Sequence, residues 1–305
     1  MADLTPLPSA SSKLRAMLAE DNAIVVCPGV YDGFTARLAI KTGFNILYMT
    51  GAGTTMSRLG AADLGLATMN DMRDNATMIA NIDPKIPVIA DADTGYGGPL
   101  MVGRTTAAYI NGGVAAFHLE DQATTKRCGH LSNKQLVPAS TFNSRIRAAA
   151  ATRTQLSRDI VIIARTDALA DHGYDEAVSR LKGAVECGAD VAFLEGVRSA
   201  EEARKFCAEM KELGVPALYN CVPGGVSPLF DVQQAKNLGY KIVITPTLAL
   251  GAVYEAVGKA FKDLKEAGET KGNAVAVRDL FESCGLKEAV EFDQSCGGKG
   301  FENGA

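Results

Sequence analysis

Short runs of β-branched and other apolar residues alternate with longer stretches of mixed polarity along most of the chain. In the longer stretches, such as 174–188 and 200–213, apolar residues recur every three or four positions, which predicts helices. The short runs have the length and the flanking turn residues of buried strands. They predict eight strands, at residues 23–30, 45–51, 87–93, 115–121, 160–167, 191–196, 216–220 and 241–246.

This alternation indicates a parallel sheet, because parallel neighbours need a long crossover between them. Eight strand–helix units within roughly 250 residues match a (β/α)8 TIM barrel of the α/β class. A doubly wound open sheet is the alternative, but residues 28–33 read PGVYDG after the first strand and lack its GxGxxG fingerprint. We therefore expect one barrel domain over residues 1–305.

The two ends of the chain add helices to this pattern. Residues 12–20, SKLRAMLAE, read as an amphipathic helix that covers one end of the barrel. After the last strand, 251–267 and 275–290 form two further helical patterns, separated by a polar break. A barrel needs only one helix there, so we expect these extra C-terminal helices (about 251–290) to contact another subunit.

Composition narrows the partners and the compartment. A net charge of −4 argues against a nucleic acid or a membrane surface as the main partner. The seven cysteines are scattered without zinc-finger spacing, which indicates unpaired thiols in a reducing compartment. With no recognisable leader and no apolar run near 18 residues, we expect a cytoplasmic protein.

Charged residues gather where the predicted strands end, which is where barrel enzymes carry their active sites. Asp91 and Asp93 end the third strand and should face the same side, and Glu120 ends the fourth. Capping of the following helices is the alternative role. Three carboxylates on adjacent strands exceed what capping needs, so they favour a hard cation such as Mg²⁺ or Mn²⁺.

Other strand ends leave more than one interpretation open. Arg165 needs an anionic partner, which is either Glu195 or a substrate carboxylate. Asp121 and Asp167 suit capping or bracing as well as catalysis. His118 faces the same side as Glu120, and we expect a core or supporting role for it. The amides of residues 51–53 could hold an anionic oxygen, although turns also favour glycine.

The segment 121–135, which contains TTKRCGHLSNK, follows the fourth strand and should lie above this rim. It carries Gly129 and few apolar anchors, which is typical of a mobile lid. Lys126, Arg127 and His130 would favour the thiolate of Cys128 and attract an anionic substrate. A solvated basic loop with an unreactive thiol is the alternative. A cysteine in this position could act as a nucleophile or a proton donor.

The motifs DADTGYGG (91–98), FHLEDQ (117–122), KRCGH (126–130) and IARTDA (163–168) resemble the isocitrate lyase/phosphoenolpyruvate mutase superfamily. The similarity runs from PGVYDG at 28–33 to FESCGL at 281–286. The KRCGH loop resembles members that cleave carbon–carbon bonds and disfavours the mutase branch. The resemblance implies a barrel whose last helix is swapped between subunits of a homotetramer.

The resemblance also implies roles for individual residues. Asp91 would bind Mg²⁺ or Mn²⁺, and Cys128 would be the general acid that protonates the enolate left by cleavage. Arg165 would bind one end of the substrate together with backbone amides. The other implied metal groups, acting largely through waters, are Asp93, Glu120 and Asp63. The other implied site residues are Thr50, Gly51, Ala52, Tyr48, Lys126, Gly129, His130, Glu195 and Asn220.

Two departures from the family pattern concern the substrate. Residues 220–225 read NCVPGG, where the resembling lyases and hydrolases tend to have a glutamate soon after the asparagine. Pro246 stands where the oxaloacetate hydrolases resemble one another in a serine. The resemblance therefore implies a lyase for a 2-hydroxy di- or tricarboxylate of the 2,3-dimethylmalate or 2-methylisocitrate type. Hydrolysis of oxaloacetate to oxalate and acetate is the alternative, and a non-enzymatic binding oligomer is disfavoured.

Overall fold

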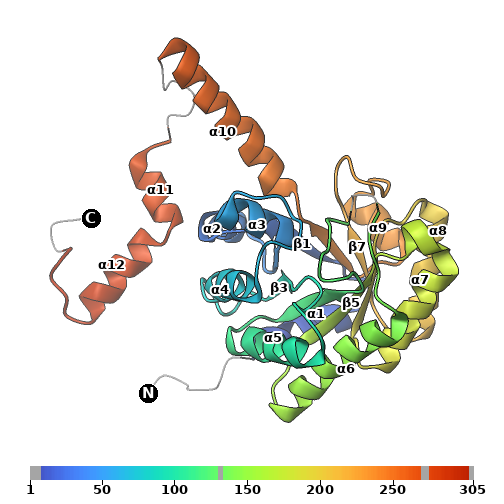
Figure 1. Ribbon diagram of the computed structural model, residues 1–305. Coiled ribbons are helices and arrows are strands. Elements are labelled where there is room, and N and C mark those ends of the chain that lie inside the picture. The colour runs from blue at the N-terminus through green and yellow to red at the C-terminus, as the bar shows by residue number, and fades with distance from the viewer. Residues whose placement is uncertain (1–7, 130–132, 269–274, 302–305) are drawn as a thin grey trace.

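Eight parallel strands form a closed barrel in the computed structural model, which describes residues 8–129, 133–268 and 275–301 (Figure 1). The strands pair in sequence order, and β1 closes the barrel by pairing with β8, Val25 opposite Ile242. The predicted TIM barrel is confirmed. The strands are β1 (Val25–Val30), β2 (Leu47–Met49), β3 (Val88–Asp91), β4 (Ala116–Glu120), β5 (Val161–Thr166), β6 (Val191–Leu194), β7 (Ala217–Asn220) and β8 (Ile242–Thr245).

Helices cover the outside of the barrel between consecutive strands (Figure 1). Each strand buries apolar side chains on both faces, one against these helices and one inside the barrel, which explains the near-continuous apolar runs in the sequence. The helices are α2 (Gly33–Lys41), α3 (Gly51–Leu59), α4 (Met69–Ala80), α5 (Pro99–Asn111), α6 (Ala139–Gln155), α7 (Leu169–Glu186), α8 (Ala200–Glu212) and α9 (Val232–Leu238).

Helix α1 (Ala10–Ala19) lies across the amino-terminal end of the strands. Its Leu14 is fully buried and belongs to the cluster that fills the barrel interior, together with Cys27 and Ile89. Burying one leucine side chain in this way stabilises the fold by roughly 1.5–3 kcal/mol. With this end filled, access to the barrel interior is left at the carboxyl ends of the strands.

Helix α10 (Leu248–Ala267) leaves the barrel after β8 and extends away from it (Figure 1). None of its residues, all of them described, is buried, and Tyr254 and Phe261 are 84% and 69% exposed. Two shorter helices, α11 (Val277–Ser283) and α12 (Leu286–Ser295), follow. These are the extra C-terminal helices expected from the sequence, whereas exchange of a helix between subunits stays a prediction. No described helix has the length and apolarity needed to span a membrane.

Candidate active site

A small cavity of about 50 Å³ opens at the carboxyl ends of the strands. Side chains from different strands converge on it, as expected for a barrel enzyme. The segment after β4 forms part of its wall. The lining residues are Tyr48, Thr50, Ala52, Asp63, Asp91, Glu120, Lys126, Arg127, Cys128, Gly129, Arg165, Glu195, Asn220, Val222, Pro246 and Thr247.

Most of the side chains predicted from the sequence therefore meet at one cavity. Gly51 lies immediately beside Asp91, although it is not part of the lining. Asp93 does not line this cavity either; it contacts Lys126, which does. The two-residue alternation that put Asp93 on the same face as Asp91 fails, because β3 ends at Asp91 and Asp93 has a positive φ of 47°. His130 lies outside the described residues.

The first turn of α3 packs directly against Asp91. A Cβ atom at Gly51 would lie 2.3 Å from Asp91 Oδ2, so only glycine permits this approach. The other oxygen, Asp91 Oδ1, accepts a hydrogen bond from the Asp93 amide at 2.8 Å. Thr50 caps α3, and the amides of its first turn have no partner within the helix. Such a helix start suits an anionic oxygen of a ligand.

Glu120, on the neighbouring strand β4, lines the same cavity as Asp91 and is 1% exposed. Its Oε2 is 3.4 Å from Arg165 Nη1, whereas its Oε1 is buried without a hydrogen-bond partner among the described residues. Burial raises the pKa of Asp91, and it raises the pKa of Glu120 well above the usual range. A bound cation would favour the ionised forms of both carboxylates.

Lys126 already joins two of the predicted metal groups. Its Nζ lies 2.5 Å from Asp63 Oδ1 and 2.5 Å from Asp93 Oδ1, and its side chain is only 4% exposed. Burial opposes the charge on the lysine, but the surrounding carboxylates raise its pKa well above the usual range. Burial also raises the pKa of Asp93 to about 6, although Lys126 opposes this shift.

The donor set fits a divalent cation held by few protein ligands. In the described part of the chain, no three His, Cys, Asp or Glu side chains are close enough together to hold one ion. Mg²⁺ accepts such a site, since it commonly takes one or two carboxylates and keeps several waters. The described rim also has more carboxylates than cations: Asp63, Asp91, Asp93, Glu120, Asp167 and Glu195 face Lys126, Arg127, Lys134 and Arg165.

Arg165, at the end of β5, lines the cavity beside Glu120. Its Nε and Nη2 donate to Asp167 at 3.0 and 3.1 Å, and its Nη2 lies 3.4 Å from Glu195 Oε2. Asn220 Nδ2 donates to the same Glu195 oxygen at 2.9 Å. The two partners expected for Arg165, Glu195 and a substrate carboxylate, are therefore compatible. Glu195 contacts the guanidinium, which still lines the cavity where a substrate would bind.

Asp121 and Asp167 have bracing contacts and do not line the cavity. Asp121 accepts hydrogen bonds from the Thr166 hydroxyl at 2.6 Å and the Asp167 amide at 3.0 Å. Burial opposes ionisation of Asp167, but Arg165 and Lys134 lower its pKa to about 2. These two carboxylates hold the end of β5 in place.

Tyr48 and His118 form a hydrogen-bonded pair inside the barrel. The Tyr48 hydroxyl lies 2.9 Å from His118 Nε2, and His118 Nδ1 lies 3.6 Å from Asp91 Oδ1. Burial, aided by Arg165, lowers the pKa of His118 to about 3, so the imidazole is neutral at pH 7. His118 has the supporting role expected of it, and Tyr48 is the member of the pair that reaches the cavity.

Residues 121–129, which follow β4, bring Cys128 to the cavity. The Ala123 amide donates to the Gln135 carbonyl at 2.7 Å, which joins this stretch to the residues that lead into α6. Gln122 exchanges hydrogen bonds with the backbone of Arg127, which shapes the turn before the half-buried Cys128. None of the seven cysteines, all within the described residues, forms a disulfide.

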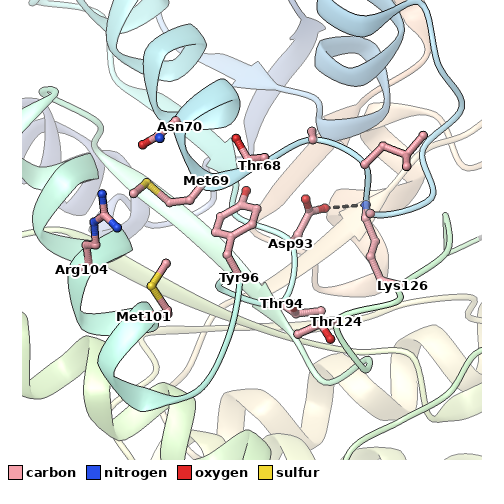
Figure 2. Close-up of a pocket in the computed structure, with 13 residues that line it drawn as sticks. Thr68, Met69, Asn70, Asp93, Thr94, Tyr96, Met101, Arg104, Thr124 and Lys126 are labelled. Atoms are coloured by element: carbon pink, nitrogen blue, oxygen red, sulfur yellow. Dashed lines mark ion pairs between the residues drawn. The ribbon is translucent and has the colours of Figure 1, made fainter.

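A second cavity of about 370 Å³ lies beside the first and shares Lys126 with it. Figure 2 shows the ion pair between Asp93 and Lys126 at one end, with Tyr96 and Met101 along the wall. Asp93 is its one carboxylate among the described residues, and no cysteine lines it. The smaller cavity, which gathers carboxylates, arginine and thiol, is therefore the candidate active site.

Three residues near the site have no assigned role from the sequence. Val222 and Thr247 line the cavity, and Lys134 contacts Asp167. Arg127, which was expected to act on Cys128 and an anionic substrate, lines the cavity as well. Val222 and Thr247 follow the ends of β7 and β8, so the rule that barrel sites gather at strand ends could have found them. Nothing in the polar run around Lys134 distinguishes it from a solvated residue.

Comparison with known proteins agrees with this geometry. Residues 14–265 match the family described as phosphoenolpyruvate phosphomutase. The chain is 37% identical to the 2,3-dimethylmalate lyase of Eubacterium barkeri over 93% of this chain and 97% of that protein. It is 39% identical to the 2-methylisocitrate lyase of Aeropyrum pernix, over 87% and 83% of the two chains.

Solved structures extend the similarity over nearly the whole chain. One of a 2,3-dimethylmalate lyase is 50% identical with a TM-score of 0.95, covering 98% of this chain and 99% of that one. One of an oxaloacetate acetylhydrolase, in complex with 3,3-difluorooxalacetate, is 51% identical with a TM-score of 0.93, covering 96% and 99%. The protein therefore belongs to the phosphoenolpyruvate phosphomutase family, within the phosphoenolpyruvate mutase/isocitrate lyase superfamily.

Proposed function

We propose that this protein is a divalent-metal lyase that cleaves a carbon–carbon bond of a 2-hydroxy di- or tricarboxylate. The observation that carries the proposal is the single cavity onto which Asp91, Glu120, Arg165 and Cys128 all open. Its walls offer carboxylates for a cation, a guanidinium for a substrate carboxylate and a thiol for proton transfer. The similarity to 2,3-dimethylmalate lyase and 2-methylisocitrate lyase makes their substrates the first to test.

Asp91 would hold Mg²⁺ or Mn²⁺ directly, with Glu120, Asp93 and Asp63 acting largely through waters. When bound, the metal supplies Lewis-acid polarisation of substrate oxygens and stabilisation of negative charge. Arg165 and the amides of Gly51 and Ala52 would bind the carboxylate of the 2-oxo product. Tyr48 would orient the 2-oxygen of the substrate through a hydrogen bond.

The proton balance assigns Cys128 its role. The 2-hydroxyl loses its proton to a base and becomes the carbonyl of the 2-oxo acid, while the neighbouring carbon–carbon bond breaks. The bonding electrons stay on the leaving carboxylate fragment as an enolate, and the Cys128 thiol protonates its carbon. Cleavage of 2,3-dimethylmalate in this way gives pyruvate and propionate, and 2-methylisocitrate gives pyruvate and succinate.

Hydrolysis of oxaloacetate to oxalate and acetate is the second candidate. The similarity to oxaloacetate acetylhydrolase favours it. Pro246 on the cavity wall favours the lyase, because the hydrolases resemble one another in a serine there. Parallel assays of pyruvate and oxalate, on 2,3-dimethylmalate, 2-methylisocitrate and oxaloacetate with Mg²⁺ or Mn²⁺, separate the two. Oxalate from oxaloacetate without pyruvate from either hydroxy acid would reject the lyase.

The assembly and the compartment belong to the same proposal. The exposed apolar side chains of α10 would pack against a second copy of the chain, as in a helix-swapped homotetramer. Cysteines that form no disulfide fit the reducing cytoplasm. Sedimentation at several protein concentrations tests the assembly, and a monomer at every concentration would contradict it.

A further inference from the structure

Lys134, which has no part in the proposed catalysis, makes two contacts beside the candidate active site. Its Nζ donates to the Gly129 carbonyl at 2.7 Å and to Asp167 Oδ1 at 2.8 Å. The side chain is 5% exposed although the residue lies in a polar loop segment. An ammonium group that is buried to this extent, on a long flexible side chain, indicates a specific structural task.

The two contacts connect the segment that carries Cys128 to the carboxylate that holds Arg165. Gly129, which follows Cys128, rests on Arg165 so closely that a Cβ atom there would lie 2.2 Å from Nη2. Asp167 holds the same guanidinium through Nε and Nη2. A closed ring of contacts therefore runs from Gly129 through Lys134, Asp167 and Arg165 back to Gly129. It sets the distance between the thiol-bearing segment and the guanidinium.

Charge gives Lys134 a second effect on the same group. Arg165 faces three buried carboxylates, those of Asp167, Glu120 and Glu195. Lys134 shares Asp167 Oδ1 with the arginine and offsets part of this negative charge. Without the ammonium, Asp167 would attract Arg165 more strongly, and the Gly129 carbonyl would lose its buried donor.

We propose that Lys134 is a positioning residue that aligns Cys128 with Arg165 by clamping the Gly129 carbonyl to Asp167. The proposal rests on the lyase function proposed above, in which Arg165 holds the substrate and Cys128 protonates the product. Lys134 does not line the cavity. Its loss should therefore affect the proton-transfer step more than substrate binding.

Steady-state kinetics of Lys134→Met, Lys134→Gln and Lys134→Arg test this role on the hydroxy acid that the wild type cleaves. We expect Lys134→Met to lower kcat about 30–100-fold and to change KM less than about threefold, because small misplacements of reacting groups cost this much. Lys134→Arg, which keeps the positive charge, should have a kcat at least about tenfold higher than that of Lys134→Met. Lys182→Met on α7, which removes an exposed ion pair with Glu209 of α8, is the matched control.

Alkylation of Cys128 by iodoacetamide, followed by peptide mass spectrometry, gives a readout that needs no turnover. We expect Lys134→Met to speed this alkylation about fivefold or more, and Lys134→Gln, which keeps an uncharged donor, to have a smaller effect. The exposed Cys284 serves as the internal reference, and its rate should not change. If Lys134→Met fails to fold, Lys134→Gln takes its place. Its Cys128 alkylation should still be faster than that of the wild type, and an unchanged rate would overturn the proposal.

Three results would overturn the proposal. The first is an unchanged Cys128 alkylation rate in a folded Lys134→Met, and the second is an increase in the Cys284 rate by the same factor as the Cys128 rate. The third is a rise in KM with kcat unchanged, since Lys134 would then support binding alone. If the wild type cleaves none of the acids, the lyase function fails by itself, and the alkylation rates still decide whether Lys134 clamps this segment.

Discussion

The two ends of the barrel both join arginines to carboxylates, but the charges are balanced at one end and not at the other. At the amino-terminal end, Arg15 binds Asp159 through two nitrogens at 2.8 and 2.9 Å and reaches Asp190 at 3.2 Å. Arg153 also contacts Asp190, at 2.5 Å. In this described cluster two cations face two carboxylates, and each carboxylate has partners for both oxygens.

At the carboxyl-terminal end, carboxylates outnumber cations and polar atoms stay unsatisfied. Glu120 Oε1 and Asn220 Oδ1 are buried without a hydrogen-bond partner among the described residues. Buried carboxylates without full compensation weaken a fold, and proteins keep them where a ligand completes the site. The amino-terminal cluster therefore stabilises this barrel, whereas the rim carries a stability cost that the proposed binding of a metal and a substrate would explain.

The largest effect that would separate the two ends is the loss of the thiol at the rim. Cys128→Ser should lower kcat about 10²–10⁴-fold, the range of a lost general acid, and leave the melting temperature within a few degrees. Kinetics on the cleaved acid and a thermal melt check this. Turnover close to that of the wild type would exclude Cys128 as the acid.

A rim carboxylate should be dispensable for folding but not for metal binding. We expect Asp91→Asn to weaken Mg²⁺ binding at least about tenfold, because it removes a charged ligand. Burial raises the pKa of Asp91, so the neutral amide should leave the metal-free protein as stable as the wild type, or more so. Calorimetric titration and denaturant unfolding measure the two properties. A clear loss of stability would break the contrast between the ends.

Removing a carboxylate at the amino-terminal end should instead lower the stability and leave catalysis unchanged. Asp190→Ala removes partners of Arg15, Arg153 and the Ile162 amide, and we expect a loss of about 1–3 kcal/mol in the free energy of unfolding. Values of kcat and KM should stay within about twofold of the wild type. Impaired turnover in a stable variant would show that the amino-terminal cluster also serves catalysis.

The smallest expected effect is a loss of stability at low pH. It tests Asp167, whose carboxylate braces the rim. The pKa of Asp167 is lowered to about 2, since Arg165 and Lys134 outweigh the opposing effect of burial. Its ionised form therefore stabilises the fold above pH 4, and this contribution is lost as the pH falls towards 2. Between pH 5 and pH 3 the wild type should lose about 1 kcal/mol more than Asp167→Asn in urea unfolding. Equal losses would mean that Asp167 is not held as an anion.

The barrel and the strand-end residues could be predicted from the sequence for a simple physical reason. Strands buried on both faces give apolar runs, and a charged residue at the end of such a run has to reach the rim. Asp91, Glu120 and Arg165 follow this rule, and all three line the cavity. The motif around Cys128 could be predicted to lie at the site because its cations and its thiol are adjacent in sequence.

Contacts made beyond the strand ends could not be predicted in the same way. Asp93 leaves the alternation of β3 through a positive φ, and its carboxylate turns to Lys126 instead of sharing the cavity with Asp91. Lys134 meets Asp167 across 33 positions of sequence. Such pairings depend on how a loop folds back over the barrel, and neither periodicity nor spacing encodes that.

The contact between Gly51 and Asp91 also limits how the gene can change. Even the methyl group of alanine would overlap the carboxylate at residue 51, and every larger side chain would displace it further. In a library of random variants, position 51 should tolerate no replacement, whereas Ala52 next to it already carries a side chain. Selection on this enzyme would thus be recorded most sharply at a residue whose importance lies in having no side chain.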